Sequence, residues 1–155
     1  MDMIRRPLSD IERLDWLRLI RTENVGPVTF FRLLERFGSA AQALKALPEM
    51  ALRGGRTSPL RVPSKSELER ELSAGVRLGS RVLAACEPDY PEALAAIDDA
   101  PPLISVLGNI HLLKKRAVAL VGARNASLNG RRFAQQLARE LAESGLVVVS
   151  GMARD

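Results

Sequence analysis

Two apolar runs joined by one amphipathic segment constrain the fold of this chain more than any other feature of its sequence. The runs occupy residues 117–121 and 146–149, and neither contains a charged side chain. The segment between them, residues 127–144, repeats large apolar residues every four positions and carries charged and polar residues on the opposite face. Two fully apolar strands joined by such a helix form a right-handed βαβ unit with a parallel sheet covered on both faces. The sequence therefore predicts an α/β fold.

Two further apolar runs, at residues 82–86 and 103–107, precede this unit and are also expected to be strands. Residues 79–155 are accordingly predicted to form an α/β domain that holds only the first part of its parallel sheet. After residue 149 no predicted helix remains to cover the second face of that sheet. Because an uncovered face and an open edge would expose apolar surface, we expect the 155 residues to be part of a longer protein.

The segment ahead of the sheet has the pattern of a helical hairpin. A capping box of Ser9 and Glu12 introduces a first helix, expected at about residues 10–22. Asn24-Val25-Gly26-Pro27 ends this helix, and its proline suits the first turn of a second helix, which Gly38 terminates.

Two more helices are expected after this hairpin. The third runs from Ser39 to the residue before Pro48, and the fourth occupies about residues 66–78. Between them, residues 53–66 are rich in Gly, Pro and Ser and are interpreted as a connector. Residues 1–78 are therefore predicted to form a small all-helical module, separate from the α/β domain.

The composition excludes several classes of protein. One cysteine, Cys86, and one histidine, His111, cannot form an internal disulfide or a zinc site of the usual type, and they disfavour Cys/His nucleophilic enzymes. The longest uncharged stretch, residues 100–113, is too short to cross a bilayer and is interrupted by proline and glycine. The charged N-terminus lacks the apolar run of a secretory signal. We expect a soluble, cytoplasmic protein without membrane contact, metal or cofactor.

The basic residues are unevenly distributed along the chain. The formal net charge is +5, and residues 100–139 contain seven basic residues and no acidic one. This distribution mildly favours a polyanionic partner for the α/β part. The most obvious basic cluster, at residues 114–116, precedes its strand and is expected at the opposite end of the sheet from the loop after that strand. We interpret this cluster as a solvated strand entry rather than as part of an anion site.

The turn after the strand at residues 117–121 occupies the position at which open α/β sheets bind ligands. Gly122 permits close backbone approach, the amides of the next helix supply donors, and Arg124 adds a bidentate fork, a combination suited to phosphate. Ser127 is the predicted N-cap of that helix. The spacing matches neither the dinucleotide fingerprint nor the P-loop. The alternative, in which Gly122 and Gly130 serve only a tight turn and helix packing, stays open.

Arg131 and Arg132 lie near the first turn of the same helix, where a positive charge opposes the macrodipole at a cost of about 0.3–1 kcal/mol each. A broken local rule often marks a functional site, so Arg131 is included among the candidate phosphate ligands. The alternative is a pair of solvated arginines on the polar face of the helix.

Four motifs stand in order along the second half of the chain. They are Tyr90-Pro91-Glu92-Ala93-Leu94; Ala100-Pro101-Pro102-Leu103 with Leu107-Gly108-Asn109; Val118-Ala119-Leu120-Val121-Gly122-Ala123-Arg124 with Ser127 and Gly130; and Val149-Ser150-Gly151-Met152-Ala153-Arg154. Together they resemble the DNA-processing protein A (DprA/Smf) family over about residues 80–155. The segment around Asn24-Val25-Gly26-Pro27 is similar to the helical module that precedes the Rossmann-like domain in this family.

The resemblance assigns candidate site residues in two loops. Those matching the first phosphate-contacting loop of the family are Gly122, Arg124, Ser127 and Gly130, and those matching the start of the second are Ser150, Gly151 and Arg154. Two positions depart from the family pattern. Asn129 stands in place of an aromatic residue, which weakens an expected stacking contact, and Asp155 stands where the family continues with glycine.

The resemblance implies a bacterial protein that binds single-stranded DNA without sequence preference and helps load the RecA recombinase during natural transformation. It implies no catalytic step, and it implies a homodimer for the full-length protein. A second class of function remains, a Rossmann-like enzyme that binds a nucleotide at the same loop, because a fold does not fix a function. In a third reading the helical module binds a protein partner and the α/β part is a scaffold.

The turn at residues 24–27 also resembles a helix-hairpin-helix DNA-binding turn, in which Gly-x-Gly-Pro is usual. Asn24 replaces the first glycine, a tolerable change because Asn enters the left-handed region more easily than most residues. The alternative, a hairpin that only packs, stays open. The aromatic residues of the module are expected in its core rather than on a base-stacking surface. They are Trp16, Phe30, Phe31 and Phe37.

Overall fold

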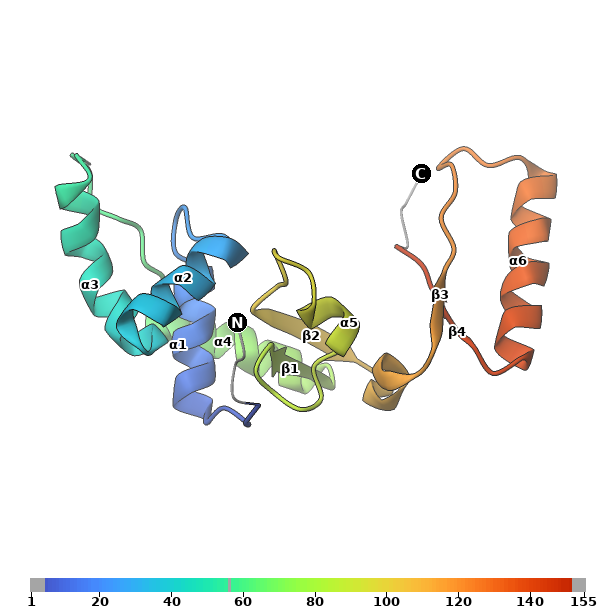
Figure 1. Cartoon of the computed structure of the whole chain (residues 1–155), viewed down its shortest axis with the longest axis horizontal. Coiled ribbons are helices and arrows are strands. Elements are labelled where there is room, and N and C mark those ends of the chain that lie inside the picture. The colour runs from blue at the N-terminus through green and yellow to red at the C-terminus, as the bar shows by residue number, and fades with distance from the viewer. Residues whose placement is uncertain (1–4, 56, 152–155) are drawn as a thin grey trace. The chain divides into compact units, whose positions relative to one another are not determined.

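The computed structural model of the chain describes residues 5–55 and 57–151 (Figure 1). The chain divides into two compact units, Met1–Ile110 and His111–Asp155, called here the N-terminal unit and the C-terminal unit. In the described part of the chain, no helix combines the length and the apolar character that crossing a membrane requires.

The N-terminal unit opens with the predicted helical hairpin. Helix α1 (Asp10–Ile20) begins with the capping box, in which the Ser9 hydroxyl accepts the Glu12 N–H and the Glu12 carboxylate accepts the Ser9 N–H. Helix α2 (Pro27–Phe37) starts at its proline and ends at Gly38, whose φ of +77° is the left-handed conformation that glycine adopts without strain. These local predictions are confirmed.

The turn between α1 and α2 also has the predicted conformation. Asn24 has φ +62°, and among the described non-glycine residues it alone has a positive φ. Asn tolerates this conformation better than most residues, so it replaces glycine there at little cost. Val25 follows with its side chain buried, which ties the turn to the core.

Helix α3 (Ala40–Arg53) starts at its Ser39 N-cap and continues through Pro48. The prediction that Pro48 ends this helix is wrong. Met50, beyond the proline, packs against the core, and Leu47 is buried, so tertiary packing outweighs the lost hydrogen bond. The connector is therefore shorter than expected, and helix α4 (Lys65–Arg77) follows it with Ser64 as N-cap.

The core of the N-terminal unit contains the aromatic residues that the sequence predicted there. Trp16 and Phe30 are buried and meet edge to face with ring centroids 5.0 Å apart. Phe31 and Phe37 are partly buried against the same cluster. A second, smaller cluster joins α1 to α4 through Leu14, Leu17 and Leu68.

Strands β1 (Ser80–Ala84) and β2 (Leu103–Leu107) form an antiparallel pair, with Val82 opposite Ser105. They had been expected to belong to the parallel sheet, and the structure instead pairs them with each other and includes them in the N-terminal unit. The chain turns back between them through the short helix α5 (Glu92–Ala95). The domain division after residue 78 stays a prediction.

The turn between β1 and β2 is anchored by Tyr90. Its side chain is 2% exposed, and its hydroxyl donates a hydrogen bond of 2.7 Å to the carbonyl oxygen of Pro101. Burial raises the pKa of Tyr90 to about 12, which further favours the protonated phenol that donates this hydrogen bond. The Tyr-Pro and Ala-Pro-Pro motifs noted in the sequence thus meet in one structural contact.

The C-terminal unit contains the predicted βαβ arrangement. After a 3-10 turn (η1, Ile110–Lys114), strand β3 (Ala117–Ala119) is followed by helix α6 (Leu128–Glu143) and strand β4 (Val147–Val149). The strands are parallel, with Ala117 opposite Val147, so the α/β class is confirmed. Both strands are shorter than the apolar runs that predicted them.

Several apolar side chains of the C-terminal unit are exposed in its described part. Val121 is 94% exposed and Val149 is 50% exposed, whereas Val118 and Val148 are half-buried. Phe133 on α6 is also largely exposed. The apolar surface of this unit is therefore only partly covered by its own residues.

Candidate nucleic-acid interface

The loops after β3 and β4 lie at the same end of the C-terminal unit (Figure 1). The Leu120 N–H donates to the Val149 carbonyl oxygen at 2.9 Å, so the ladder extends one residue beyond β3 before the chain leaves it. Since parallel strands share the direction of their carboxyl ends, the loop that starts at Gly122 and the segment Ser150–Gly151 both begin at the carboxyl end of the sheet. Arg154, also predicted in the site, lies outside the described residues.

Ser127 caps α6 as predicted. Its Oγ accepts the Gly130 N–H at 3.1 Å, and its backbone is extended. A hydroxyl that accepts one hydrogen bond still carries a hydrogen that it can donate. The cap therefore does not consume the capacity of Ser127 to donate to an anion.

Packing within the protein does not require glycine at either position of this loop. A Cβ on Gly130 would lie 3.4 Å from Ser127 Oγ, which is an ordinary van der Waals contact. A Cβ on Gly122 would meet nothing within 4 Å, and the φ of this residue is not in the left-handed region. The protein's own atoms therefore do not account for Gly122.

The three arginines of the region occupy different places. Arg124 lies exposed in the loop itself, two residues after Gly122. Arg131 lies in the first part of α6, where its Nε donates a hydrogen bond of 3.2 Å to the carbonyl oxygen of Ala126. Arg132 follows it with an exposed side chain. The first turn of α6 contains no acidic residue, so the positive end of the helix is not neutralised locally.

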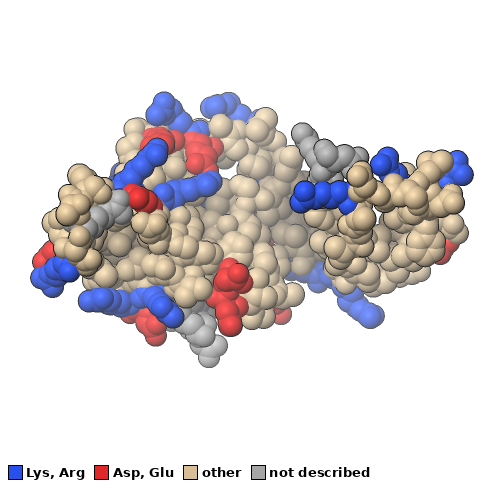
Figure 2. All heavy atoms as spheres, turned by 90° about the horizontal axis from the view of Figure 1, so that it is seen from above, with Lys and Arg blue, Asp and Glu red and all other residues tan. Residues whose placement is uncertain are grey.

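The net charge of the protein belongs to the C-terminal unit. Residues 1–110 contain 15 basic and 15 acidic residues, so the formal charge of +5 arises in residues 111–155. Figure 2 shows acidic and basic side chains mixed over the N-terminal unit, and mostly basic ones over the C-terminal unit at the right of the view. A polyanion is therefore attracted to the unit that carries the candidate loops.

The basic cluster at residues 114–116 lies where the sequence predicted it. The Arg116 carbonyl oxygen accepts the Val147 N–H at 2.9 Å, which places this residue beside the amino end of β4. The candidate loops begin at the carboxyl ends of the strands, so cluster and loops lie at opposite ends of the sheet.

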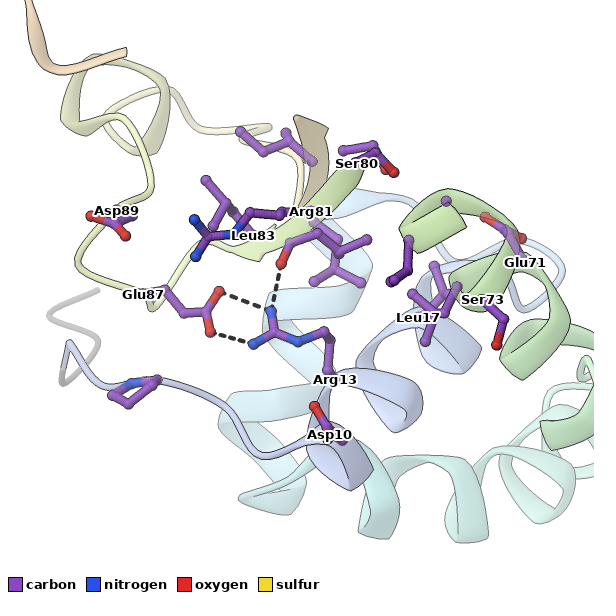
Figure 3. Close-up of a pocket in the computed structure, with 18 of the residues that line it drawn as sticks. Asp10, Arg13, Leu17, Glu71, Ser73, Ser80, Arg81, Leu83, Glu87 and Asp89 are labelled. Atoms are coloured by element: carbon purple, nitrogen blue, oxygen red, sulfur yellow. Dashed lines mark hydrogen bonds and ion pairs between the residues drawn. The ribbon is translucent and has the colours of Figure 1, made fainter. Parts of the chain in front are cut away.

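A concave region lies in the N-terminal unit, between α1, α4 and β1, with a volume of about 1060 Å³ (Figure 3). Its lining includes four arginines and four acidic residues, so it offers no net charge to a polyanion. The centre of Figure 3 is the ion pair of Arg13 with Glu87, whose side chain is 7% exposed. Burial raises the pKa of Glu87, but hydrogen bonds from Arg13 and from backbone N–H groups outweigh burial, and the pKa lies below its ordinary value.

This ion pair was not predicted from the sequence. The two residues are 74 positions apart, and neither belongs to a motif that a local pattern reveals. Their hydrogen bonds go to each other and to the backbone of Leu8, Val82 and Ala84, which makes them part of the framework of the unit.

Comparison with known families assigns both parts of the chain. Residues 10–74 match the description "DprA-like N-terminal HHH domain", and residues 81–155 match "DNA recombination-mediator protein A". The chain is 27% identical to Protein Smf of Synechocystis over 94% of its own length. It is 33% identical to DNA processing protein DprA of Bacillus subtilis over 56%, and 43% identical to DNA processing protein DprA of Streptococcus pneumoniae over 42%.

The matched segments cover 39%, 30% and 23% of those three relatives, so the chain spans less than half of their length. The first match extends from α1 into α4, and the second covers the strands β1 to β4. The chain belongs to the DprA/Smf family.

Proposed function

We propose that the C-terminal unit binds single-stranded DNA through its phosphates, without sequence preference. The observation that carries this proposal is that two loops begin at the same end of the β3–β4 sheet, in the unit that holds the whole net charge. Loops at the carboxyl ends of parallel strands are where such sheets bind ligands.

The local chemistry of the first loop supports a phosphate ligand. The bare backbone at Gly122 lets a phosphate oxygen approach the amide groups, and the exposed Arg124 can donate two parallel hydrogen bonds. The 16-residue helix α6 adds its positive end and the N–H groups of its first turn. Ser127 can donate its hydroxyl hydrogen while it caps α6.

The second loop contributes Ser150 and Gly151, and the proposed site also includes Gly130, Arg131 and Arg154. A strand of DNA offers many phosphates in a row, whereas a mononucleotide offers one cluster. Two loops at one end of the sheet suit a ligand with repeated phosphates, which favours a nucleic-acid strand over a nucleotide-binding enzyme.

We further propose the role that membership of the family suggests: a cytoplasmic recombination mediator that loads RecA on single-stranded DNA during natural transformation, acting as a homodimer and without a catalytic step of its own. Two of the relatives are named DNA processing proteins. The absence of any carboxylate between residues 100 and 139 agrees with a binding role, because a general base would have to come from elsewhere.

The test is a titration of the protein with single-stranded DNA, duplex DNA and a mononucleotide under identical salt. The proposal expects the tightest binding for single strands, affinity that rises with strand length, and little dependence on base composition. Tight binding of the mononucleotide, with no higher affinity for longer strands, would contradict the proposal. It would favour the alternative hypothesis of a nucleotide-binding enzyme. RecA loading is tested separately, by the rate of RecA filament formation on single-stranded DNA with and without the protein.

A further inference from the structure

Arg131 makes a contact that a solvent-facing phosphate ligand does not need. Its Nε donates a hydrogen bond of 3.2 Å to the carbonyl oxygen of Ala126. Ala126 closes the loop that opens at Gly122, and it lies directly before the N-cap of α6. The contact therefore joins the helix to the end of the candidate phosphate loop.

Two other observations concern the same stretch. Ser127 Oγ accepts the Gly130 N–H at 3.1 Å, and a Cβ on Gly130 would lie 3.4 Å from that oxygen and 3.9 Å from the Ala126 Cβ. Ala126 is half-buried, whereas residues 121–125 are exposed. The end of the loop is thus held against the first turn of α6, and the rest of the loop projects from that anchor.

We propose that Arg131 is a positioning residue of the phosphate loop rather than a phosphate ligand. Its Nε–H holds the Ala126 carbonyl and so orients the backbone of residues 122–125, whose amides then need no reorganisation when a phosphate arrives. That this hydrogen bond prepares the loop for a phosphate rests on the proposed function. The hydrogen bond between Arg131 and Ala126 itself does not.

The proposal assigns the role of Arg131 to its Nε–H donor and not to its positive charge. Three substitutions at this position test the donor and the charge separately. Glutamine has its Nε2 at the same number of bonds from Cα as the arginine Nε, so Arg131→Gln keeps a donor there and removes the charge. Arg131→Lys keeps the charge and has a methylene at that position. Arg131→Met has neither, with a chain of similar length. The same three changes at Arg132, which is exposed and adjacent on α6, provide the matched control.

The first measurement needs no DNA. Backbone amide NMR and hydrogen exchange of residues 122–130 are compared among the three Arg131 variants. We expect Arg131→Gln to retain the wild-type amide shifts and protection, and Arg131→Lys and Arg131→Met to change both, with melting temperatures recorded to exclude unfolding. Equal amide spectra for all three variants would overturn the positioning role.

The second measurement is the affinity for single-stranded DNA at several salt concentrations. Arg131→Lys and Arg131→Met are expected to weaken binding by about two- to tenfold, which corresponds to the loss of one typical hydrogen bond. Arg131→Gln is expected to recover most of that affinity with the wild-type salt slope. Arg132 is exposed, and any contribution that it makes to binding should depend on its charge, so lysine should perform better than glutamine there.

The reverse order at Arg131, with lysine active and glutamine weak with a shallower salt slope, would overturn the proposal and make Arg131 a direct phosphate ligand. If the wild-type chain fails to bind single-stranded DNA, the proposed function is refuted, and the amide measurement still decides whether Arg131 positions the loop. The two failures are therefore distinguishable.

Discussion

The guanidinium of Arg13 and the carboxylate of Glu87 form a bidentate ion pair, with Nη1–Oε2 and Nη2–Oε1 distances of 2.9 and 2.7 Å. The same groups reach the backbone of β1: Arg13 Nη1 donates to the Val82 carbonyl oxygen at 2.7 Å, and Glu87 Oε2 accepts the Ala84 N–H at 2.8 Å. These backbone groups lie on the edge of β1 that does not pair with β2. The ion pair thus connects α1 to the sheet and satisfies an otherwise open strand edge.

Loss of one partner of this pair should destabilise the N-terminal unit strongly. Arg13→Met leaves the Glu87 carboxylate buried without its counterion, and the expected loss is about 3 kcal/mol in the free energy of unfolding. Urea denaturation followed by circular dichroism measures the change. Arg53→Met is the control, because the Arg53–Glu49 pair is exposed and its loss should cost less than about 0.5 kcal/mol. Similar losses for the two variants would show that burial does not set the strength of these pairs.

The free energy of unfolding should fall at acidic pH, because the carboxyl groups of Glu12 and Glu87 both have lowered pKa values in the folded protein. Hydrogen bonds from Arg6 and from the backbone and side chain of Ser9 lower the pKa of Glu12 to about 2, from an ordinary value of 4.5. A carboxyl group with a lowered pKa in the folded state stabilises the protein above its unfolded pKa, and this contribution disappears as the pH falls from about 4.5 towards 2. Glu12→Gln should flatten the dependence of unfolding free energy on pH in this interval. An NMR titration that finds the pKa of the Glu12 carboxyl group near 4.5 in the folded protein would contradict the prediction.

Arg124→Ala should weaken single-stranded DNA binding by about 1–3 kcal/mol, because a charge-assisted phosphate contact is lost. The melting temperature should not change, since the side chain is exposed and lies in a loop. Fluorescence anisotropy with a labelled oligonucleotide measures the affinity. Unchanged binding by a normally folded variant would exclude a phosphate role for Arg124.

Changing Lys114, Lys115 and Arg116 together to Ser should reduce the affinity less than Arg124→Ala alone. The cluster precedes β3, at the end of the sheet opposite the candidate loops, so DNA bound at the loops does not require it. The same anisotropy assay compares the two variants. A larger loss for the triple variant would mean that DNA follows a different path along this unit.

Salt dependence should identify the binding as electrostatic. The logarithm of the affinity should fall linearly with the logarithm of the salt concentration, by about 0.7 per phosphate neutralised on a single strand. Base stacking is expected to contribute little, because Phe133 is the one aromatic residue of the C-terminal sequence. Arg124→Ala should reduce the slope by about the number of phosphates that Arg124 contacts. A flat response to salt would rule out phosphate-dominated binding.

Features that depend on neighbours in the chain were predictable. The Ser9–Glu12 capping box, the left-handed Asn24 and the Ser127 cap each involve atoms within a few residues, so residue type and spacing specify them. The four-residue period of α6 between two apolar runs specified the parallel β3–β4 pair in the same way. These local signals also led to the candidate loop at Gly122.

Features that depend on distant partners were not predictable from local patterns. Helix α3 continues through Pro48 because Met50 finds a core to pack against, and β1 and β2 pair with each other because the chain between them turns back at Tyr90. The Arg13–Glu87 pair joins residues 74 positions apart. Periodicity and capping report interactions within one helix or strand, whereas these contacts exist only after the elements pack, when buried groups take the partners that the tertiary structure brings to them.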